Sequence, residues 1–194
     1  MTLRQFAQRI RVPAGFVLAP LLFITARPTA ASLVTGAVVA VIGLTIRGWA
    51  SGYLKKNEEL TVTGPYAHTR NPLYFGTFFL GAGVAIGAGT LLFTVLFVGL
   101  YLLIYLPVMF AEADTMRALF SRDYEDYSKQ VPLFLPRLTP YREARNRQAA
   151  SIGNQEGRGF DSSLYLRHRE YRAAFGLLVV YVLLAVKLVL LSAG

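Results

Sequence analysis

The sequence predicts an all-α fold, that of a polytopic helical membrane protein with about five transmembrane helices. Of its 194 residues, 54% are hydrophobic and only 16% are charged, and the mean hydropathy is +0.44. A soluble domain is ordinarily less apolar, and the chain lacks the alternating polarity of an outer-membrane β-barrel. Because lipid offers the backbone no hydrogen-bond partner, only helices and closed barrels span a bilayer. We therefore expect the membrane part to be helical.

The first apolar run is short. Residues 12–26 follow a basic tail and are interrupted by Pro20. The run is shorter than the ~20 residues that a straight span needs, so a short or tilted first span is expected. A basic start followed by a short apolar run and small residues is also typical of a secretory signal peptide, which is the alternative.

Four further apolar runs predict the remaining spans, residues 29–46, 73–89, 91–110 and 173–192. In the third span, Gly83 and Gly87 form a small-xxx-small step that lets helix backbones approach closely. Residues 87–90 predict a tight turn into the fourth span. Pro107 is expected to kink that span near its end, and a charged amphipathic segment then continues to Gln130.

Polar side chains near the ends of two spans have two interpretations each. Arg47 and Trp49 follow the second span, where interface anchors are common; alternatively, Arg47 faces a functional site. Lys187 lies in the last span and is expected to snorkel toward the interface. A polar contact between helices is the alternative for this lysine.

The charge distribution predicts the orientation. The N-terminal tail carries three Lys or Arg residues, residues 47–72 carry four and residues 111–172 carry eleven, which is 18 of the chain's 20. Residues 87–90 carry none. Because basic loops stay on the cytoplasmic side, we expect an integral protein of the plasma or inner membrane with its N-terminus and all three basic regions in the cytoplasm.

The same distribution predicts three parts, a membrane core over residues 1–138, a basic connector over 139–172 and an additional helix over 173–194. The connector is rich in arginine and contains a Gly/Asn/Gln-rich stretch. Since it lies between two membrane spans, anionic membrane lipids are its expected partner, and nucleic acid is not.

Polar and aromatic side chains concentrate in residues 64–76, between two apolar runs. Pro72 suits the first turn of a helix, where its missing N–H has no partner to lose, and Asn71 is a plausible N-cap. The loop therefore feeds directly into a span and places Arg70 and Tyr74 at the water–lipid boundary. A hydrophilic connector with good turn chemistry is the alternative.

Two blocks carry a resemblance to a known family. The first reads Gly64-Pro65-Tyr66, then Arg70-Asn71-Pro72-Leu73-Tyr74-Phe75-Gly76; the second reads Glu112-Ala113-Asp114, then Phe120, Tyr124 and Tyr127, then Val131-Pro132-Leu133-Phe134-Leu135-Pro136. Over residues 35–138 the chain resembles the superfamily of isoprenylcysteine carboxyl methyltransferases and phospholipid methyltransferases. It departs from that pattern at Asn71, where the family often has histidine, at Ala113 in place of a second acid, and at Ser121 in place of glycine.

The resemblance implies a membrane methyltransferase. S-adenosylmethionine would be the methyl donor, S-adenosylhomocysteine the product, and the acceptor a lipophilic small molecule from the bilayer. The cofactor site would lie on the cytoplasmic side. Arg70 and Glu112 are the candidate catalytic residues. The candidate cofactor-binding residues are Tyr66, His68, Asn71, Tyr74, Gly76, Glu112, Leu135 and Pro136.

The residue types fit that chemistry. Glu112, followed by Asp114, can hold a cationic ammonium or offset a sulfonium charge. Tyr66 and Tyr74 offer aromatic faces to a cation, worth ~0.5–2 kcal/mol, and Arg70 can fork onto a carboxylate. Methyl transfer by in-line displacement needs alignment and exclusion of water rather than a nucleophilic side chain.

Several alternatives stay open. The chain has no cysteine and two histidines, so a thiolate nucleophile is excluded and no metal site is expected. The acceptor is either a carboxylate of the isoprenylcysteine type, which is favoured, or an amine head group such as phosphatidylethanolamine. The competing functions are an NADPH-dependent oxidoreductase resembling sterol reductases and a non-catalytic membrane scaffold. For Tyr124 and Tyr127, interfacial anchoring is the favoured interpretation.

Overall fold

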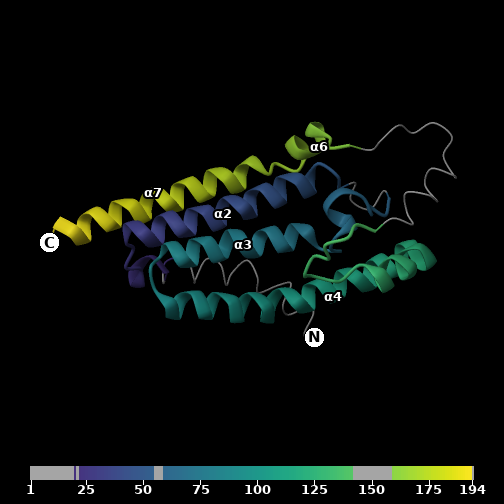
Figure 1. Ribbon diagram of the computed structural model, residues 1–194, viewed down its shortest axis with the longest axis horizontal. Coiled ribbons are helices and arrows are strands. Elements are labelled where there is room, and N and C mark those ends of the chain that lie inside the picture. The colour runs from purple at the N-terminus through teal and green to yellow at the C-terminus, as the bar shows by residue number, and fades with distance from the viewer. Residues whose placement is uncertain (1–19, 21, 55–58, 142–158, 194) are drawn as a thin grey trace. The chain divides into compact units, whose positions relative to one another are not determined.

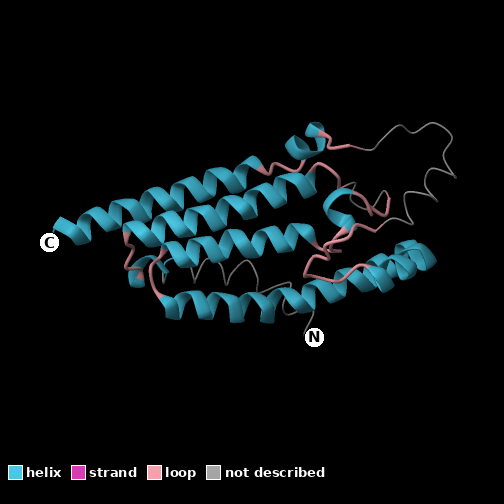
Figure 2. Cartoon of the chain, in the orientation of Figure 1, coloured by secondary structure: helices cyan, strands magenta, loops and turns pink. Residues whose placement is uncertain are grey.

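The computed structural model describes residues 20, 22–54, 59–141 and 159–193. The elements in that part of the chain are helical (Figure 1), namely α2 (Ala30–Ser51), the 3₁₀-helix η1 (Gly64–Ala67), α3 (Pro72–Gly87), α4 (Leu91–Gln130), α6 (Ser162–Arg167) and α7 (Tyr171–Ala193). Within the described ranges there is no strand, as Figure 2 shows. The predicted all-α class is confirmed.

Three helices are long and apolar enough to cross a membrane: α2, α4 and α7. They coincide with the predicted second, fourth and fifth spans. The predicted third span forms α3, which is apolar but has only 16 residues, fewer than the ~20 of a straight crossing. The predicted first span falls mostly on residues outside the described ranges, so the count of five stays a prediction. An integral membrane protein is the class that these helices support.

The chain divides into two compact units. The span unit comprises Met1–Leu44, Gly76–Ala111 and Tyr171–Gly194, and the loop unit comprises Thr45–Phe75 and Glu112–Glu170. The span unit contains most of the apolar helical residues, whereas the loop unit contains the segments that connect them. The predicted partition at residues 138 and 172 follows the sequence instead, and it stays a prediction.

Glycines bring α2 and α3 together in the span unit. A Cβ atom added to Gly83 would lie 2.5 Å from the carbonyl oxygen of Gly36 and 2.5 Å from the backbone nitrogen of Ala40. A Cβ added to Gly36 would lie 2.6 Å from the nitrogen of Gly87. Real Cβ contacts are never this short, so the two backbones pack where only glycine fits. The predicted role of the glycine step is confirmed.

The turn between α3 and α4 forms as predicted. Gly89 has φ +74°, a left-handed conformation that favours glycine. The backbone N–H of Arg27 donates to the carbonyl of Ala88 over 2.8 Å, which ties the segment preceding α2 to this turn.

Lys187 of α7 binds the segment preceding α2. Its ammonium donates to the carbonyl oxygens of Phe23 and Ile24, the latter over 2.9 Å. The alternative of a polar contact between helices is therefore confirmed for Lys187, and its expected snorkelling stays a prediction. Nearby in the same unit, the Tyr181 hydroxyl donates to the carbonyl of Gly83 over 2.9 Å. A charged group in an apolar helix is stabilised by such partners.

The fourth span and the amphipathic segment together form α4, two helical parts that meet at a kink at Ser121. The helix continues through Pro107, and its non-helical residue is Ser121, with φ 39° and ψ −111°. This region is accessible mainly to glycine, which is the residue that the superfamily pattern has at this position. The kink at Ser121 was not predicted, and the kink expected at Pro107 stays a prediction.

Replacing Ser121 with glycine should stabilise the protein. A non-glycine residue in a sparsely populated backbone region costs about 1–3 kcal/mol, and glycine avoids most of this cost. We expect Ser121→Gly to raise the unfolding temperature in detergent. Ser128→Gly is the matched control, because Ser128 lies in the same helix and its hydroxyl donates to the carbonyl of Glu125. Glycine there should destabilise by about 0.5–1 kcal/mol; a loss of stability in both variants would contradict the strain at Ser121.

Candidate active site

The loop unit contains a cavity of about 320 Å³, which is at the lower end of the roughly 300–1,000 Å³ typical of small-molecule sites. Its lining combines charged groups, aromatic rings and apolar side chains from both sequence blocks. These residues are Arg47, Leu54, Leu60, Thr61, Tyr66, Arg70, Asn71, Pro72, Leu73, Tyr74, Glu112, Ala113, Met116, Tyr124 and Tyr127.

The two sequence blocks are joined by hydrogen bonds. The backbone N–H of Arg70 donates to the carbonyl of Pro132 over 3.0 Å. The Thr69 hydroxyl donates to the carbonyl of Phe134 over 2.9 Å, and the Thr69 side chain is 2% exposed. The proline-rich end of the second block therefore fixes the backbone of the first block where Arg70 enters the cavity.

The helix start predicted at Pro72 is confirmed, since α3 begins there. The carbonyl of Asn71 accepts the N–H of Phe75 over 3.0 Å, as the residue preceding the first turn does. The Asn71 side-chain amide donates to the carbonyl of Leu133 over 2.9 Å. Asn71 thus connects the start of α3 to the second block as well as lining the cavity.

Arg70 has one hydrogen-bonded nitrogen and one without a partner. Its Nη1 donates to the Tyr124 hydroxyl over 3.1 Å, and the guanidinium lies 5.9 Å from the centre of that ring. Its Nε is buried and has no hydrogen-bond partner among the described residues. Leaving a buried donor unsatisfied costs about 1–3 kcal/mol, more when the group is charged. This atom is therefore suited to an anionic or carbonyl group of a ligand.

Tyr124 and Tyr127 are core residues. Tyr124 is 3% exposed and Tyr127 is 2% exposed, and both pack with Val62, Ala113 and Val131. Tyrosines that anchor a protein at a membrane interface keep their hydroxyl in contact with water. The favoured interpretation of interfacial anchoring is therefore wrong.

Tyr66 has a buried hydroxyl among charges. Burial raises the pKa of that hydroxyl well above its usual range, and the negative charges of Glu112 and Glu170 raise it further, while Arg47 acts in the opposite direction. Tyr66 thus stays protonated. Its backbone carbonyl accepts a 2.6 Å hydrogen bond from the Tyr127 hydroxyl, which holds η1 against α4.

Glu112 and Asp114 differ in their surroundings. Glu112 is half-buried and lines the cavity. In the described part of the chain, no side chain forms an ion pair or hydrogen bond with its carboxylate. Asp114 is exposed and pairs with Arg117 over 3.1 Å, and it does not line the cavity. Of the two acids, Glu112 is available to a cationic ligand.

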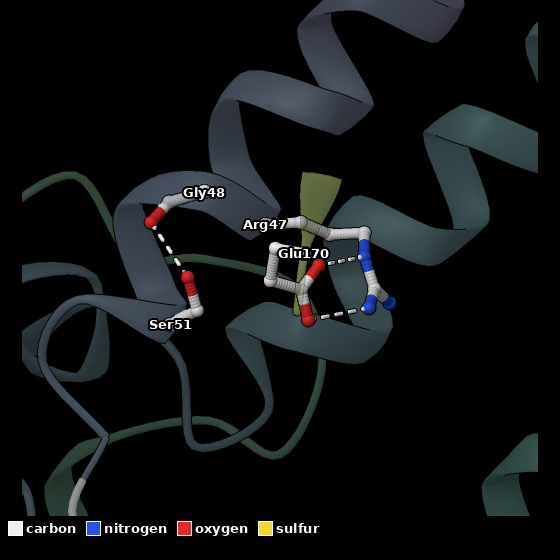
Figure 3. Close-up of polar contacts among 4 residues, drawn as sticks. All are labelled: Arg47, Gly48, Ser51 and Glu170. Carbon is white, nitrogen blue, oxygen red and sulfur yellow. Dashed lines mark hydrogen bonds and ion pairs between the residues drawn. The ribbon is translucent and has the colours of Figure 1, made fainter. Parts of the chain in front are cut away.

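Arg47 lines the cavity and forms an ion pair with Glu170 (Figure 3). This pairing agrees with the alternative that Arg47 faces a functional site, and the choice between that role and an interface anchor stays a prediction. Sequence reasoning missed Glu170 altogether, because the partners are 123 residues apart. The available signal was a lone acid in an arginine-rich stretch, between Arg169 and Arg172.

The remaining candidate residues do not line the cavity. His68 lies in the loop unit, where its Nδ1 is 2.8 Å from the carbonyl of Arg137. Leu135 is 69% exposed, and Pro136 is also exposed. Gly76 belongs to the span unit, where its carbonyl lies beside Gly43. The residues of the predicted site that line the cavity are Tyr66, Arg70, Asn71, Tyr74 and Glu112.

Among the described residues, no three His, Cys, Asp or Glu side chains are grouped as metal ligands.

Comparisons with known proteins agree with the motifs. The cobalt-zinc-cadmium resistance protein CzcN of Cupriavidus metallidurans is 32% identical over 146 residues, which cover 68% of this chain and 64% of that protein. The nickel-cobalt-cadmium resistance protein NccN of Alcaligenes xylosoxydans is 29% identical over 109 residues, 55% of this chain and 49% of that protein. The chain thus spans about half to two thirds of the length of these curated relatives. No solved structure matches it significantly.

The family comparison covers most of the cavity. The model of the phospholipid methyltransferase family matches residues 21–123, which is more than half of the chain and includes Arg70, Tyr74 and Glu112. Enzymes of such a family transfer methyl groups at membranes, in agreement with the three apolar helices. The chain therefore belongs to the phospholipid methyltransferase family.

Proposed function

We propose that the chain transfers a methyl group from S-adenosylmethionine to a lipophilic acceptor, at the cavity of the loop unit. The observation that carries this proposal is that one cavity contains a carboxylate and a buried guanidinium nitrogen that both lack a partner among the described residues. Glu112 has no partner among the described residues, and Arg70 has a buried Nε with none. A ligand with both a cationic and an anionic group satisfies both.

The donor has those groups. Its amino-acid end is zwitterionic and its sulfur is a sulfonium. Glu112 would take the ammonium or offset the sulfonium charge, and the Nε of Arg70 would donate to the carboxylate, as charge-assisted hydrogen bonds do. The Tyr74 ring lines the same cavity and offers a face to the cation. The residues present therefore fit the donor.

The residues of the chain would act by binding and alignment. When bound, the donor supplies an electrophilic methyl group. The lining has no cysteine, and Tyr66 is held protonated by burial, so it can donate a hydrogen bond but does not act as a base. Rate would come from orienting the acceptor and excluding water.

A lipophilic acceptor suits a protein with membrane-spanning helices, because a lipid reaches such a protein without leaving the bilayer. Arg70 favours a carboxylate of the isoprenylcysteine type, since its fork matches two oxygens. Glu112 favours an amine head group such as phosphatidylethanolamine, and the family match adds support to that acceptor. Of the two acceptors, we propose the carboxylate.

Methyl transfer tests the proposal directly. Purified protein in detergent would be incubated with methyl-labelled S-adenosylmethionine and with farnesyl-cysteine analogue, phosphatidylethanolamine or extracted lipids. Because both relatives are named for cobalt and cadmium resistance, lipids from cells grown with and without these metals should be compared. Label confined to water-soluble products would contradict a lipid acceptor. Thermal stabilisation by NADPH and not by S-adenosylhomocysteine would indicate an oxidoreductase.

The orientation is a further proposal, and cysteine labelling tests it. Ala67 and Ala88 are buried and unsuitable as labelling sites, whereas Leu138 is 97% exposed and Leu91 is 80% exposed. With the basic regions in the cytoplasm, Leu138→Cys should be protected from an impermeant reagent in intact cells, and Leu91→Cys should react. The reverse pattern would place the cavity on the other side of the membrane.

A further inference from the structure

A segment beyond the family match packs against the end of α2 in the loop unit. The match ends at residue 123, and the segment comprises residues 159–170. The backbone N–H of Asp161 donates to the carbonyl of Gly52 over 2.9 Å. The His168 Nε2 lies 3.1 Å from the carbonyl of Leu54. The Phe160 ring covers Gly52, so that a Cβ there would lie 2.3 Å from it.

The same segment carries the ion pair between Glu170 and Arg47. Arg47 Nε donates to Oε2 over 2.9 Å and Nη2 donates to Oε1 over 2.8 Å, as Figure 3 shows. The arginine side chain is 22% exposed and the glutamate side chain 10%. A two-point pair of this kind fixes the plane of the guanidinium as well as its position.

The ion pair between Arg47 and Glu170 affects a second carboxylate, that of Glu112. Arg47 and Glu112 line the same cavity, and both charges act on the Tyr66 hydroxyl, as Glu170 does. Arg47 has a carboxylate partner in Glu170, while Glu112 has no described partner. A guanidinium released from Glu170 in this half-buried site would be attracted to the remaining carboxylate, because a charge out of water needs an opposite charge.

We propose that Glu170 is a positioning residue. By pairing with Arg47, it keeps the Arg47 guanidinium from pairing with Glu112 and neutralising the charge of that carboxylate. Glu112 then stays available to the cationic end of the methyl donor. The role in donor binding rests on the proposed function. Glu170 decides which carboxylate Arg47 pairs with, whether or not the cavity binds a methyl donor.

A purely structural role for Glu170 makes a different prediction. If the pair only fastened residues 159–170 to α2, removing both partners would harm the site at least as much as removing one. If Glu170 instead restrains Arg47, removing Arg47 as well frees Glu112 again. Replacing both members of a half-buried ion pair by uncharged residues is often nearly neutral for stability, so the double variant is expected to fold.

Donor binding separates these roles. Glu170→Gln should weaken S-adenosylhomocysteine binding by about tenfold, because the donor must displace Arg47 from Glu112. Arg47→Met combined with Glu170→Gln should restore the affinity to within about threefold of the wild type. Asp161→Ala is the matched control: it removes the side chain that accepts the N–H of Ser163 at the start of α6 and leaves the ion pair intact. Its affinity should stay unchanged, and a double variant as weak as Glu170→Gln would overturn the proposal.

A second measurement needs no methyl donor. Carbodiimide couples an amine to protonated carboxyl groups, and pairing with arginine lowers the protonated fraction. Labelling of Glu112, quantified by mass spectrometry, should fall in Glu170→Gln and recover in the double variant. If the wild type fails to bind S-adenosylhomocysteine while labelling follows this pattern, the proposed function fails and the positioning role stands. Equal labelling of Glu112 in all three proteins would contradict the positioning role.

Discussion

Replacing Gly83 with alanine should destabilise the protein by about 1–3 kcal/mol, the usual cost of overpacking a well-packed interior. The added Cβ would lie 2.5 Å from two backbone atoms of α2, the carbonyl oxygen of Gly36 and the nitrogen of Ala40. Backbone atoms cannot rotate away as a side chain does, so α3 must move as a whole. Unfolding in detergent, followed by circular dichroism against temperature, measures the effect.

Gly99→Ala is the matched control. Gly99 lies in α4, and a Cβ there would meet nothing within 4 Å. Alanine in an unobstructed helix position is favoured over glycine by roughly 0.5–1 kcal/mol, so the two substitutions should shift stability in opposite directions. Equal effects at the two glycines would contradict the close approach of α2 and α3. Gly83→Leu should be more damaging than Gly83→Ala, since the larger side chain cannot be placed without further separation of the helices.

The spans could be predicted from the sequence because hydropathy acts locally. The apolar runs at 29–46, 91–110 and 173–192 each became part of a helix long enough to cross a bilayer. Where a run ended in polar residues, the sequence predicted the end of the apolar part but not the end of the helix. In α4, helical structure resumes after the kink at Ser121 and extends to Gln130, because amphipathic residues maintain helical hydrogen bonds as well as apolar ones do.

Contacts between distant residues could not be predicted in the same way. Lys187 binds carbonyl groups 163 and 164 residues away, and sequence patterns offered snorkelling as the simpler outcome. Tyr124 and Tyr127 have the composition of an interface belt, yet they are buried by Val62 and Val131. Each of these outcomes depends on which segments meet, and hydropathy does not encode that information.

The sequence predicted those residues of the candidate site that lie within the two motif blocks, and it did not predict those outside them. Arg70, Tyr74 and Glu112 were singled out by the motifs, and all three line the cavity. His68 shares the first block, but its ring contacts the carbonyl of Arg137 and does not line the cavity. Arg47 and Glu170 lie outside both blocks, so only the folded chain reveals their pairing.

Replacing Glu112 with glutamine should weaken the binding of S-adenosylhomocysteine by roughly ten- to a hundredfold. Glutamine keeps the size and one oxygen of the side chain but loses the negative charge. A hydrogen bond to a charged group contributes about 1.5–3 kcal/mol, which corresponds to that range of affinity. Because Glu112 has no partner among the described residues, its loss leaves no other buried charge uncompensated, and the variant should remain folded. Tyr74→Ala should weaken binding as well, through loss of an aromatic face in the cavity.

Asp114→Asn is the control that distinguishes a direct contact between Glu112 and the ligand from a long-range effect of negative charge in this part of α4. Asp114 lies two positions after Glu112, its side chain is 48% exposed, and it pairs with Arg117, so it should contribute little to a ligand inside the cavity. Exposed pairs of this kind are worth about 0–1 kcal/mol, and the affinity should change by less than about fivefold.

Isothermal titration in detergent measures all three variants, and their unfolding temperatures verify that each is folded. If Glu112→Gln and Tyr74→Ala bind S-adenosylhomocysteine as tightly as the wild type, Glu112 does not hold the ammonium of the ligand and the Tyr74 ring does not face it. If Asp114→Asn and Glu112→Gln lose affinity equally, the effect is one of long-range charge, and the unpaired carboxylate of Glu112 is not the group that holds the donor.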